Sequence, residues 1–475
     1  MAGKTNELRY VSTRGTAPVL GFEDVMLTGL ARDGGLYVPE SWPQIAPAEI
    51  ESLRGLRYAD AATRIMAPFV VSDIPYDEFS EIVSDSYAGF SHSAVTPLVE
   101  IGPDQWLLEL FHGPTIAFKD VAMQLLARLM DRALQHRKSR ATIVGATSGD
   151  TGGAAIEAFA GRDAIEIFIL HPHGRVSDVQ RKQMTSCQAA NVHNIAIEGS
   201  FDDCQALVKA LFNDLERRDS LSLAGVNSIN WARIMAQCVY YFVAGAALGS
   251  PNRKLSFSVP TGNFGDIFAG YAASRMGLPV ERLVIATNVN DILARTLSHG
   301  RYEPQGVVAT SSPSMDIQVS SNFERLMFEA AERDASRVCA HMDALTGEGA
   351  FTLSGSERVT MDKLFVAESA SEVQVEATMR ELAEKTGYIC DPHTAVGLTA
   401  AERQFEPGTA MVTLSTAHPA KFPDAVEAAT SSRPEVPDHV SVKLGGDERY
   451  DVLANNYDEL ARYIESRVEV GAMAQ

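Results

Sequence analysis

One lysine in this sequence lies where it could act as a nucleophile. Residues 106–110 have the pattern of a short buried strand, residues 121–130 carry apolar side chains at helical spacing, and a Gly-Pro turn separates them. Lys119 therefore falls at the start of a helix, where burial and the positive end of the helix dipole both disfavour its ammonium form. An amine freed in this way can form a Schiff base. The alternative is a lysine whose ammonium reaches water.

Two glycine-rich loops could hold anions. Residues 145–153 and residues 260–266 each lie between a predicted strand and a predicted helix. Their glycines let backbone amides approach an anion, and the helix N-terminus adds a partial positive charge. The first loop is not a P-loop, because it lacks the Gly-Lys-Ser/Thr ending. The alternatives are a turn with a capping Thr or Asp for the first loop and an ordinary tight turn for the second.

A pair of hydroxyl side chains, Ser415 and Thr416, follows the strand predicted at residues 410–414. A hydroxyl at a strand end can hydrogen-bond a pyridine nitrogen without protonating it, whereas a carboxylate would hold that nitrogen cationic. His418 and Lys421 come next, and we expect them to support the loop, although Lys421 could meet an anion.

Taken together, these segments resemble the threonine synthases, which are fold-type-II pyridoxal-phosphate enzymes. The resemblance is densest over residues 111–120, includes both loops, residues 227–233 and residues 313–317, and is weakest after about residue 430. It implies that Lys119 carries pyridoxal 5'-phosphate as a Schiff base and moves protons at the substrate carbons. It implies that Thr416, with Ser415 as the near alternative, meets the pyridine nitrogen. The residues implied to hold the coenzyme phosphate are Gly262, Asn263, Phe264, Gly265 and Asp266.

The same resemblance implies two sets of substrate residues. The residues implied to grip the substrate α-carboxylate are Thr147, Ser148, Gly149, Asp150 and Thr151, and many fold-type-II relatives have Asn where this chain has Asp150. Ser228, Asn230 and Arg233 would suit a substrate phosphate, because a guanidinium and helix amides make a good phosphate site. The alternative there is an Asn N-cap followed by a solvated Arg. Arg175, Lys182 and Lys421 remain rival phosphate ligands.

The implied reaction converts O-phospho-L-homoserine and water to L-threonine and phosphate, the last step of threonine biosynthesis, catalysed by a carbon–oxygen lyase acting on phosphates. One alternative is another fold-type-II lyase, such as a serine or threonine dehydratase or a phosphohomoserine lyase without hydration; the leading domain and Asp150 argue against the dehydratases. A second alternative is a non-catalytic protein that binds a small phosphorylated ligand. The presence of Lys119 argues against it, because binding alone does not need a desolvated amine.

The composition argues against several classes of binding partner. The chain has 475 residues, with 41 Lys and Arg against 61 Asp and Glu, for a net charge of −20. This acidity argues against binding nucleic acid or an anionic membrane. The five cysteines are scattered without a CxxC pair, which favours a reduced compartment and predicts no metal site. There is no signal-peptide h-region and no membrane-length apolar window, so we expect a cytoplasmic protein, either a monomer or a homodimer.

The chain alternates strand and helix patterns from about residue 100, which predicts an α/β fold with parallel sheets covered on both faces. The resemblance implies two doubly wound parallel-sheet domains and an additional N-terminal domain. We expect residues 1–95 to form the N-terminal domain and residues 96–430 the catalytic core, with about 140–250 as its smaller substrate-side part. Residues 431–475 should form a connector and a final helix. In the N-terminal part, Arg14 is expected to form a salt bridge rather than bind an anion.

Overall fold

The largest sheet collects the strands that lead into the candidate site. The structure is a computed structural model that describes residues 8–147 and 149–468. Six strands lie in the order β13-β10-β9-β14-β4-β3, and only the β3–β4 pairing is antiparallel. Their bounds are β3 Leu98–Gly102, β4 Gln105–Glu109, β9 Leu255–Pro260, β10 Val280–Thr287, β13 Phe365–Ser369 and β14 Ala410–Ser415. The carboxyl ends of β4, β9, β10 and β14 therefore meet at one edge, where ligands bind in folds of this kind.

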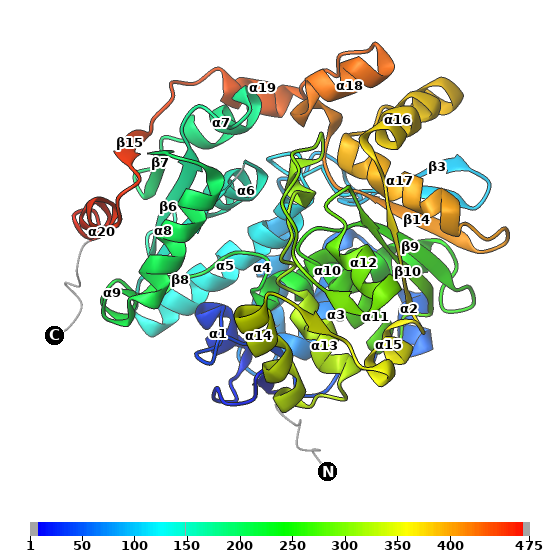
Figure 1. The fold of residues 1–475 in the computed structure, drawn as a ribbon, viewed down its shortest axis with the longest axis horizontal. Helices are drawn as coiled ribbons and strands as arrows, with labels where there is room; N and C mark the ends of the chain where they lie inside the picture. The colour runs from blue at the N-terminus through cyan, green and yellow to red at the C-terminus, as the bar shows by residue number, and fades with distance from the viewer. Residues whose placement is uncertain (1–7, 148, 469–475) are drawn as a thin grey trace.

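A second, smaller sheet lies to the left of the large one in Figure 1. It is wholly parallel, in the order β15-β7-β6-β5-β8. Its strands are β5 Ala141–Ala146, β6 Ile165–Pro172, β7 Val192–Glu198, β8 Leu223–Ala224 and β15 Asp451–Ala454. The two sheets confirm the predicted α/β fold, and the strands predicted from the sequence are present with ends shifted by a few residues at most.

Helices pack around both sheets (Figure 1). Those of the central part are α5 Lys119–Arg137, α6 Asp150–Phe159, α7 Asp178–Thr185, α8 Phe201–Asn213, α9 Leu215–Ser220, α10 Trp231–Ala247, α11 Gly265–Arg275, α12 Ile292–His299, α13 Phe323–Ala330, α14 Ala335–Glu348, α15 Gly355–Met361, α16 Glu372–Thr386 and α17 Pro392–Gln404. The helix α8 ends before Asp214, and α9 begins directly after it. The chain breaks at Asp214, whose side chain accepts a hydrogen bond from the amide of Arg217 and so caps α9.

Two further antiparallel strand pairs complete the described strands. In the N-terminal part, β1 Tyr10–Ser12 pairs antiparallel with β2 Tyr37–Pro39. Between α12 and α15, β11 Arg301–Tyr302 pairs with β12 Phe351–Thr352. Short 3₁₀ turns occur at η1 Pro313–Met315 and η2 Pro419–Lys421.

The N-terminal part shares its core with the helices of the large sheet. Its helices are α1 Phe22–Thr28, α2 Pro47–Ser52, α3 Tyr58–Val70 and α4 Tyr76–Tyr87. The α3 helix packs on α10, and α4 packs on α5, within one continuous cluster of buried apolar side chains. Arg14 donates to both oxygens of Glu324, at 3.1 and 3.0 Å, which confirms the predicted salt bridge. Thr13 donates to the same carboxylate at 2.6 Å.

The C-terminal segment does more than the predicted connector. After α18 Pro423–Thr430 it forms α19 Asp438–Leu444 over α7, then adds β15 as an edge strand parallel to β7, and ends with α20 Tyr457–Glu465 (Figure 1). Only the final helix was expected. The strand was missed because its four residues are mostly exposed and carry no alternating pattern.

The proposed division at residues 95 and 430 stays a prediction. No helix in the part of the chain that the structure describes is both long enough and apolar enough to span a membrane.

The Glu324 contacts lead to a prediction about stability. Replacing Glu324 with Ala leaves the partly buried guanidinium of Arg14 and the hydroxyl of Thr13 without their acceptor. We expect the free energy of unfolding, measured by urea titration, to fall by about 2 kcal/mol. The control is Asp60→Ala, which removes the exposed carboxylate partner of Arg57 and should change the midpoint little. An equal loss in both variants would contradict the assigned role of Glu324.

Candidate active site

Lys119 is the first residue of α5, at the turn that follows β4, as the sequence predicts. Its side chain is largely buried and only 10% exposed. The turn is fixed by Asp120, whose carboxylate accepts the amide of Thr115 at 2.8 Å and its hydroxyl at 2.7 Å. Gly113 is required there, because a Cβ atom at that position would lie 2.4 Å from the Cβ of Asp120. The lysine thus projects from a rigid turn.

The turn contains a strained residue just before the lysine. Ile116 has φ = +53°, a conformation that β-branched residues rarely adopt. The contacts that hold it there come from the loop after β14: His418 donates its amide to the carbonyl of Ile116 at 3.0 Å, and Phe118 donates to the carbonyl of Thr416 at 2.8 Å. The loop carrying Thr416 is therefore bound directly to the turn carrying Lys119.

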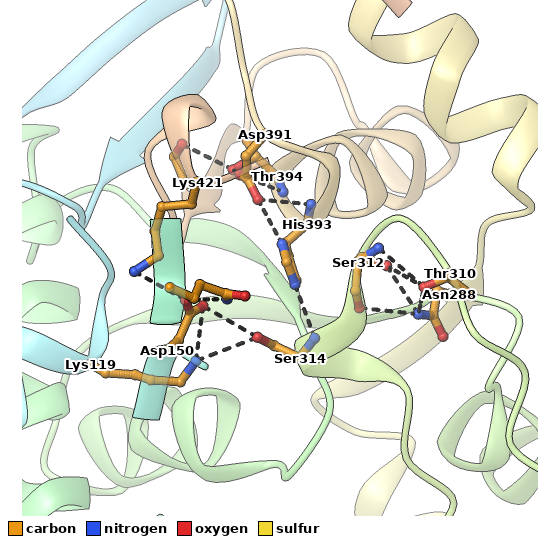
Figure 2. Close-up of polar contacts among 12 residues, drawn as sticks. Lys119, Asp150, Asn288, Thr310, Ser312, Ser314, Asp391, His393, Thr394 and Lys421 are labelled. Atoms are coloured by element: carbon orange, nitrogen blue, oxygen red, sulfur yellow. Dashed lines mark hydrogen bonds and ion pairs between the residues drawn. The ribbon is translucent and has the colours of Figure 1, made fainter. Parts of the chain in front are cut away.

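A buried carboxylate lies against the lysine (Figure 2). Oδ2 of Asp150, the first residue of α6, is 3.3 Å from Nζ of Lys119, and its Oδ1 is 3.0 Å from Nζ of Lys421. Gln180 of α7 donates to the same Oδ1 at 2.9 Å. The side chain of Lys421 is fully buried and also donates to the carbonyl of Thr115 at 2.8 Å. Two ammonium groups from the large-sheet side thus hold one carboxylate from the small-sheet side.

These charges set the proton affinities at the site. Burial lowers the pKa of Lys119 from its usual value; Asp150 opposes this effect, and Lys421 adds to it. Burial by itself would raise the pKa of Asp150, but the ammonium groups of Lys421 and Lys119 bring it well below its usual range. The predicted lowering of the Lys119 pKa is therefore confirmed, with burial as its main cause.

The first glycine-rich loop precedes Asp150. Ser148 lies outside the described residues. The hydroxyl of Thr147 accepts the amides of Gly149 and Gly152, both at 2.9 Å, so it shapes the loop from within. Gly149 has φ = +147°, and a Cβ there would lie 2.4 Å from the side chain of Gln180. Thr151 is partly exposed, and its hydroxyl has no partner among the described residues.

The second glycine-rich loop, residues 262–266, has the features of an anion cradle. Within the described part of the chain, no acceptor is recorded for the five backbone amides of this loop, which precedes and opens α11. Gly262 allows a close approach, because a Cβ there would lie 2.9 Å from the carbonyl oxygen of Ser314. Phe264 adopts φ = +64° at the N-cap. A helix N-terminus with free amides suits a phosphate group.

Asp266 is the acidic member of this cradle. It accepts hydrogen bonds from the hydroxyls of Tyr240 and Tyr241, while its Oδ2 is buried without a partner among the described residues. Burial raises its pKa to about 7, against the effect of the two tyrosine hydroxyls and of Arg233. A carboxyl group in a phosphate loop repels the phosphate less when it is only partly ionised at neutral pH.

The strand-end hydroxyls differ in their availability. Ser415 is paired with the hydroxyl of Thr394 at 3.0 Å. The hydroxyl of Thr416 has no hydrogen-bond partner among the described residues, although its side chain is mostly buried. Thr416 is therefore the better placed of the two to bind a ligand atom.

The segment before α10 is divided in its roles. Asn230 is the N-cap of α10, and both hydrogens of its amide donate to backbone carbonyls of Met26 and Gly225. This is the alternative considered from the sequence, so we do not keep Asn230 as a substrate ligand. Arg233, by contrast, is not solvated: it is 3% exposed, and its Nε has no partner among the described residues. Ser228 lies beside the cradle, 3.6 Å from a Cβ placed on Gly265.

Arg233 is electrostatically coupled to both the lysine and the cradle. Burial lowers its pKa to about 10, opposed by Tyr240 and Asp266, and its charge contributes to the lowered pKa of Lys119. Of the rival cations, Lys182 and Arg175 lower the pKa values of Glu448 and Asp203, respectively. Lys421 lies at the site but is already bound to Asp150.

Sequence reasoning included Ser314 in the resemblance without a role and missed the residues that hold it beside the lysine. Ser314 Oγ is 3.5 Å from Nζ of Lys119 and 3.4 Å from Oδ2 of Asp150. The backbone amide of Ser314 donates to Nε2 of His393 at 3.2 Å, and Nδ1 of His393 is 2.7 Å from Asp391. Asp391 followed by Pro392 is a recognisable helix-start signal, but it does not reveal these partners.

Three family models match the chain. The model described as "Threonine synthase N terminus" matches residues 9–87, the model described as "Pyridoxal-phosphate dependent enzyme" matches residues 91–417, and the model described as "Threonine synthase, C-terminal" matches residues 394–464.

Similar proteins match over nearly the full length. The chain is 51% identical to threonine synthase from Pseudomonas aeruginosa, covering 96% of this chain and 98% of that one. Its structure is similar to the crystal structure of pyridoxal-phosphate-bound threonine synthase from Brucella melitensis, with a TM-score of 0.95, 55% identity and coverage of 97% and 100% of the two chains. The yeast threonine synthase structure matches with a TM-score of 0.92, 39% identity and coverage of 98% and 99%.

The two charged groups Asp150 and Lys421 have opposite effects on the pKa of Lys119 and lead to opposite pH predictions. Asp150→Asn removes the charge that raises the Lys119 pKa, whereas Lys421→Met removes a charge that lowers it. The rate at which apo-protein captures pyridoxal phosphate covalently rises with the fraction of free amine. We expect the pH midpoint of that rate to fall in Asp150→Asn and to rise in Lys421→Met. The measurement is the appearance of visible absorbance after mixing.

Lys443→Met is the matched control, because Lys443 is an exposed lysine paired with Glu157 on α6, the same helix as Asp150. Its midpoint should equal that of the unsubstituted protein. Shifts in the same direction for both site variants would show that the assignment of these charges is wrong.

Proposed function

We infer that the chain, which belongs to the threonine synthase family, is a pyridoxal-phosphate-dependent lyase that converts O-phospho-L-homoserine and water to L-threonine and phosphate. Within the site, the main observation in support of this function is the buried lysine at the start of α5. Lys119 lies against the ionised Asp150 and, through Ser314, next to the cradle of residues 262–266. A covalent site for an aldehyde and a site for its phosphate are thus adjacent.

The residues present fit pyridoxal phosphate. The free amides of residues 262–266 and the unpaired Nε of Arg233 suit the phosphate group, and the free hydroxyl of Thr416 suits the ring nitrogen. Pyridoxal phosphate supplies a ring that accepts the electron pair left when a proton leaves a substrate carbon. We propose that Lys119 binds the coenzyme covalently between these two ends.

The side chains around Lys119 support a role in proton movement. When the lysine is released from the coenzyme, its lowered pKa increases the fraction of neutral amine that can act as a base. It can then take a proton from one substrate carbon and return a proton to the next. Asp150 lies beside Nζ of Lys119 and stabilises positive charge on that nitrogen while the proton is held there.

We propose that the first loop binds the amino-acid end of the substrate. Gly149 is the N-cap of α6 and Asp150 and Thr151 begin it; Thr151 is partly exposed, and its hydroxyl has no partner among the described residues. Thr147 contributes by holding the amides of Gly149 and Gly152 in place. Ser148 is included from the resemblance alone, since it lies outside the described residues. An α-carboxylate at the N-terminus of α6 would be stabilised by the helix dipole.

We propose that Arg233 binds a phosphate and that this phosphate belongs to the coenzyme. From the sequence, Ser228 and Arg233 were assigned to the substrate phosphate. Their positions beside Gly265 and Asp266 at the start of α11 favour the coenzyme phosphate instead. A substrate phosphate then requires a separate cation.

Three further expectations stay proposals. For the division into residues 1–95, 96–430 and 431–475, the family models support the first boundary, because one match ends at residue 87 and the next begins at residue 91. The third match begins at residue 394 and overlaps the second. A cytoplasmic location fits a biosynthetic enzyme with an acidic chain and scattered cysteines. A monomer or a homodimer acting on a small molecule, without nucleic acid or membrane partners, fits the same properties.

The first test uses the reaction itself. Purified protein loaded with pyridoxal phosphate should convert O-phospho-L-homoserine to L-threonine and phosphate in equal amounts. Lys119→Ala should lower turnover by about 10⁴-fold or more, because both the covalent attachment and the base are lost. Borohydride reduction and peptide mapping should place the pyridoxyl tag on Lys119 in the unsubstituted protein.

Lys138→Ala is the control, since Lys138 is the exposed lysine at the other end of α5. It should retain turnover and the tag. Formation of 2-oxobutanoate in place of threonine would favour a dehydratase. A tag on any other lysine would refute the assignment of Lys119.

The second test separates the two phosphates. Arg233→Met should weaken the binding of pyridoxal phosphate by about 10- to 100-fold, as expected for loss of a charged hydrogen bond. At saturating coenzyme, the KM for O-phospho-L-homoserine should change little. Equilibrium dialysis and steady-state kinetics measure the two quantities. The control is Arg128→Met, which removes another arginine whose pKa is lowered by burial, on α5 and bonded to Gln124.

The opposite result, a raised KM with unchanged coenzyme binding, would return Arg233 to the substrate phosphate.

A further inference from the structure

The buried carboxylate of Asp391 lies between two parts of the active site (Figure 2). Asp391 is the N-cap of α17, where it accepts the amides of His393 at 3.0 Å and Thr394 at 3.1 Å. Its Oδ2 is also 2.7 Å from Nδ1 of His393, and its Oδ1 accepts the hydroxyl of Thr394. Capping alone needs only the amides, so the two side-chain contacts call for a further explanation.

The contacts of His393 fix its tautomer. Nε2 accepts the backbone amide of Ser314 at 3.2 Å and therefore carries no proton. The proton is on Nδ1 and is donated to Asp391. His393 is 3% exposed. A buried, neutral imidazole with both nitrogens in use is an oriented spacer between α17 and the backbone of Ser314.

Ser314 is also held from the other side. Its turn η1 follows Ser312 and precedes Asp316, and Asn288 at the end of β10 donates to both, at 3.0 Å to the hydroxyl of Ser312 and at 2.8 Å to Asp316. Thr310 adds a hydrogen bond to Asp316 at 2.6 Å. These contacts fix the turn but do not reach the lysine. The group that reaches Lys119 is the hydroxyl of Ser314.

The hydroxyl of Ser314 and the carboxylate of Asp150 together orient the amine. Nζ of Lys119 donates to Ser314 Oγ at 3.5 Å and to Asp150 Oδ2 at 3.3 Å, and Ser314 Oγ donates to the same Oδ2 at 3.4 Å. An ammonium has three hydrogens, so two directions are occupied. When one proton leaves, the lone pair takes the remaining direction. A lysine nucleophile needs this directional control, since misplacement by about 1 Å can cost about 100-fold in rate.

We propose that Ser314 directs the Lys119 amine and that His393 and Asp391 are positioning residues that act through Ser314. The same Asp391 carboxylate reaches the other end of the site: Thr394, which it holds, is bonded to Ser415, the neighbour of Thr416. The carboxylate of Asp391 thus helps to position Ser314, beside the lysine, and the strand end before Thr416, the proposed partner of the ring nitrogen.

This proposal rests on the proposed function, and its test is separable from it. The readout is the rate at which apo-protein captures pyridoxal phosphate covalently, which does not depend on threonine formation. Ser314→Ala should slow capture and lower kcat by about 30-fold, with KM for O-phospho-L-homoserine within about threefold, as for loss of a group that orients a reactive side chain. His393→Leu should give a similar loss.

Two further variants distinguish positioning from general support of the fold. His393→Gln provides an amide oxygen that can accept the Ser314 amide, and it should recover most of the capture rate lost in His393→Leu. In the Ser314→Ala background, His393→Leu should add less than about a threefold loss, because the residue it positions is already missing its hydroxyl. The control His341→Leu removes another histidine–carboxylate pair, with Glu357 in α15, and should leave capture unchanged.

Several outcomes would overturn the proposal. One is an unchanged capture rate in Ser314→Ala, which decides the matter even if the His393 variants do not fold. Another is a multiplicative loss in the double variant, which would show that His393 acts independently of Ser314. Normal capture in every variant would reject this proposal. Absence of threonine formation by the unsubstituted protein would reject the proposed function, whatever the capture rates.

Discussion

The active site depends on one buried carboxylate held between two ammonium groups. Burying Asp150 without partners would be costly, and in the proposed reaction Lys119 cannot be its permanent partner, because the lysine nitrogen would change both charge and bonding. Lys421 is the permanent partner of Asp150. It is fully buried, and its Nζ lies 3.0 Å from Asp150, 2.8 Å from the carbonyl of Thr115 and 3.0 Å from Gln183. Because Asp150 and Gln183 belong to the small-sheet side, the same contacts join the two sheets at the reactive lysine.

The sequence was sufficient for the features that are local in the chain. Lys119 lies at a strand–turn–helix junction whose pattern is local, so its burial, its place at a helix start and the direction of its pKa shift could be inferred. The same holds for residues 262–266, where glycines between a strand and a helix predict free amides. The parallel sheets followed from the alternation of strand and helix patterns.

The remaining features could not be inferred because they join distant segments. Ser314 is 195 residues from Lys119 and 79 from His393, and neither spacing leaves a trace in local periodicity. The role of Lys421 depends on a carboxylate that is brought to it by the packing of one sheet on the other. Arg233 was expected to be solvated in the competing interpretation, and only the packing of α10 shows that it is buried. A capping residue such as Asn230, by contrast, can be recognised locally, although its sequence context also fits a ligand.

The acidity of the chain fits a proposed phosphate cradle that is built mainly from backbone amides. With a net charge of −20, a phosphate dianion is repelled at long range, so its binding must come from groups within a few ångströms, where solvent and salt screen little. Amides at the start of α11 carry fixed partial charges that do not titrate. Asp266 would weaken them if it were fully ionised. Its carboxyl instead binds the hydroxyls of Tyr240 and Tyr241, and burial raises its pKa to about 7. The acid can therefore help fix the start of α11 while adding less negative charge beside the proposed phosphate site than a fully ionised carboxylate would.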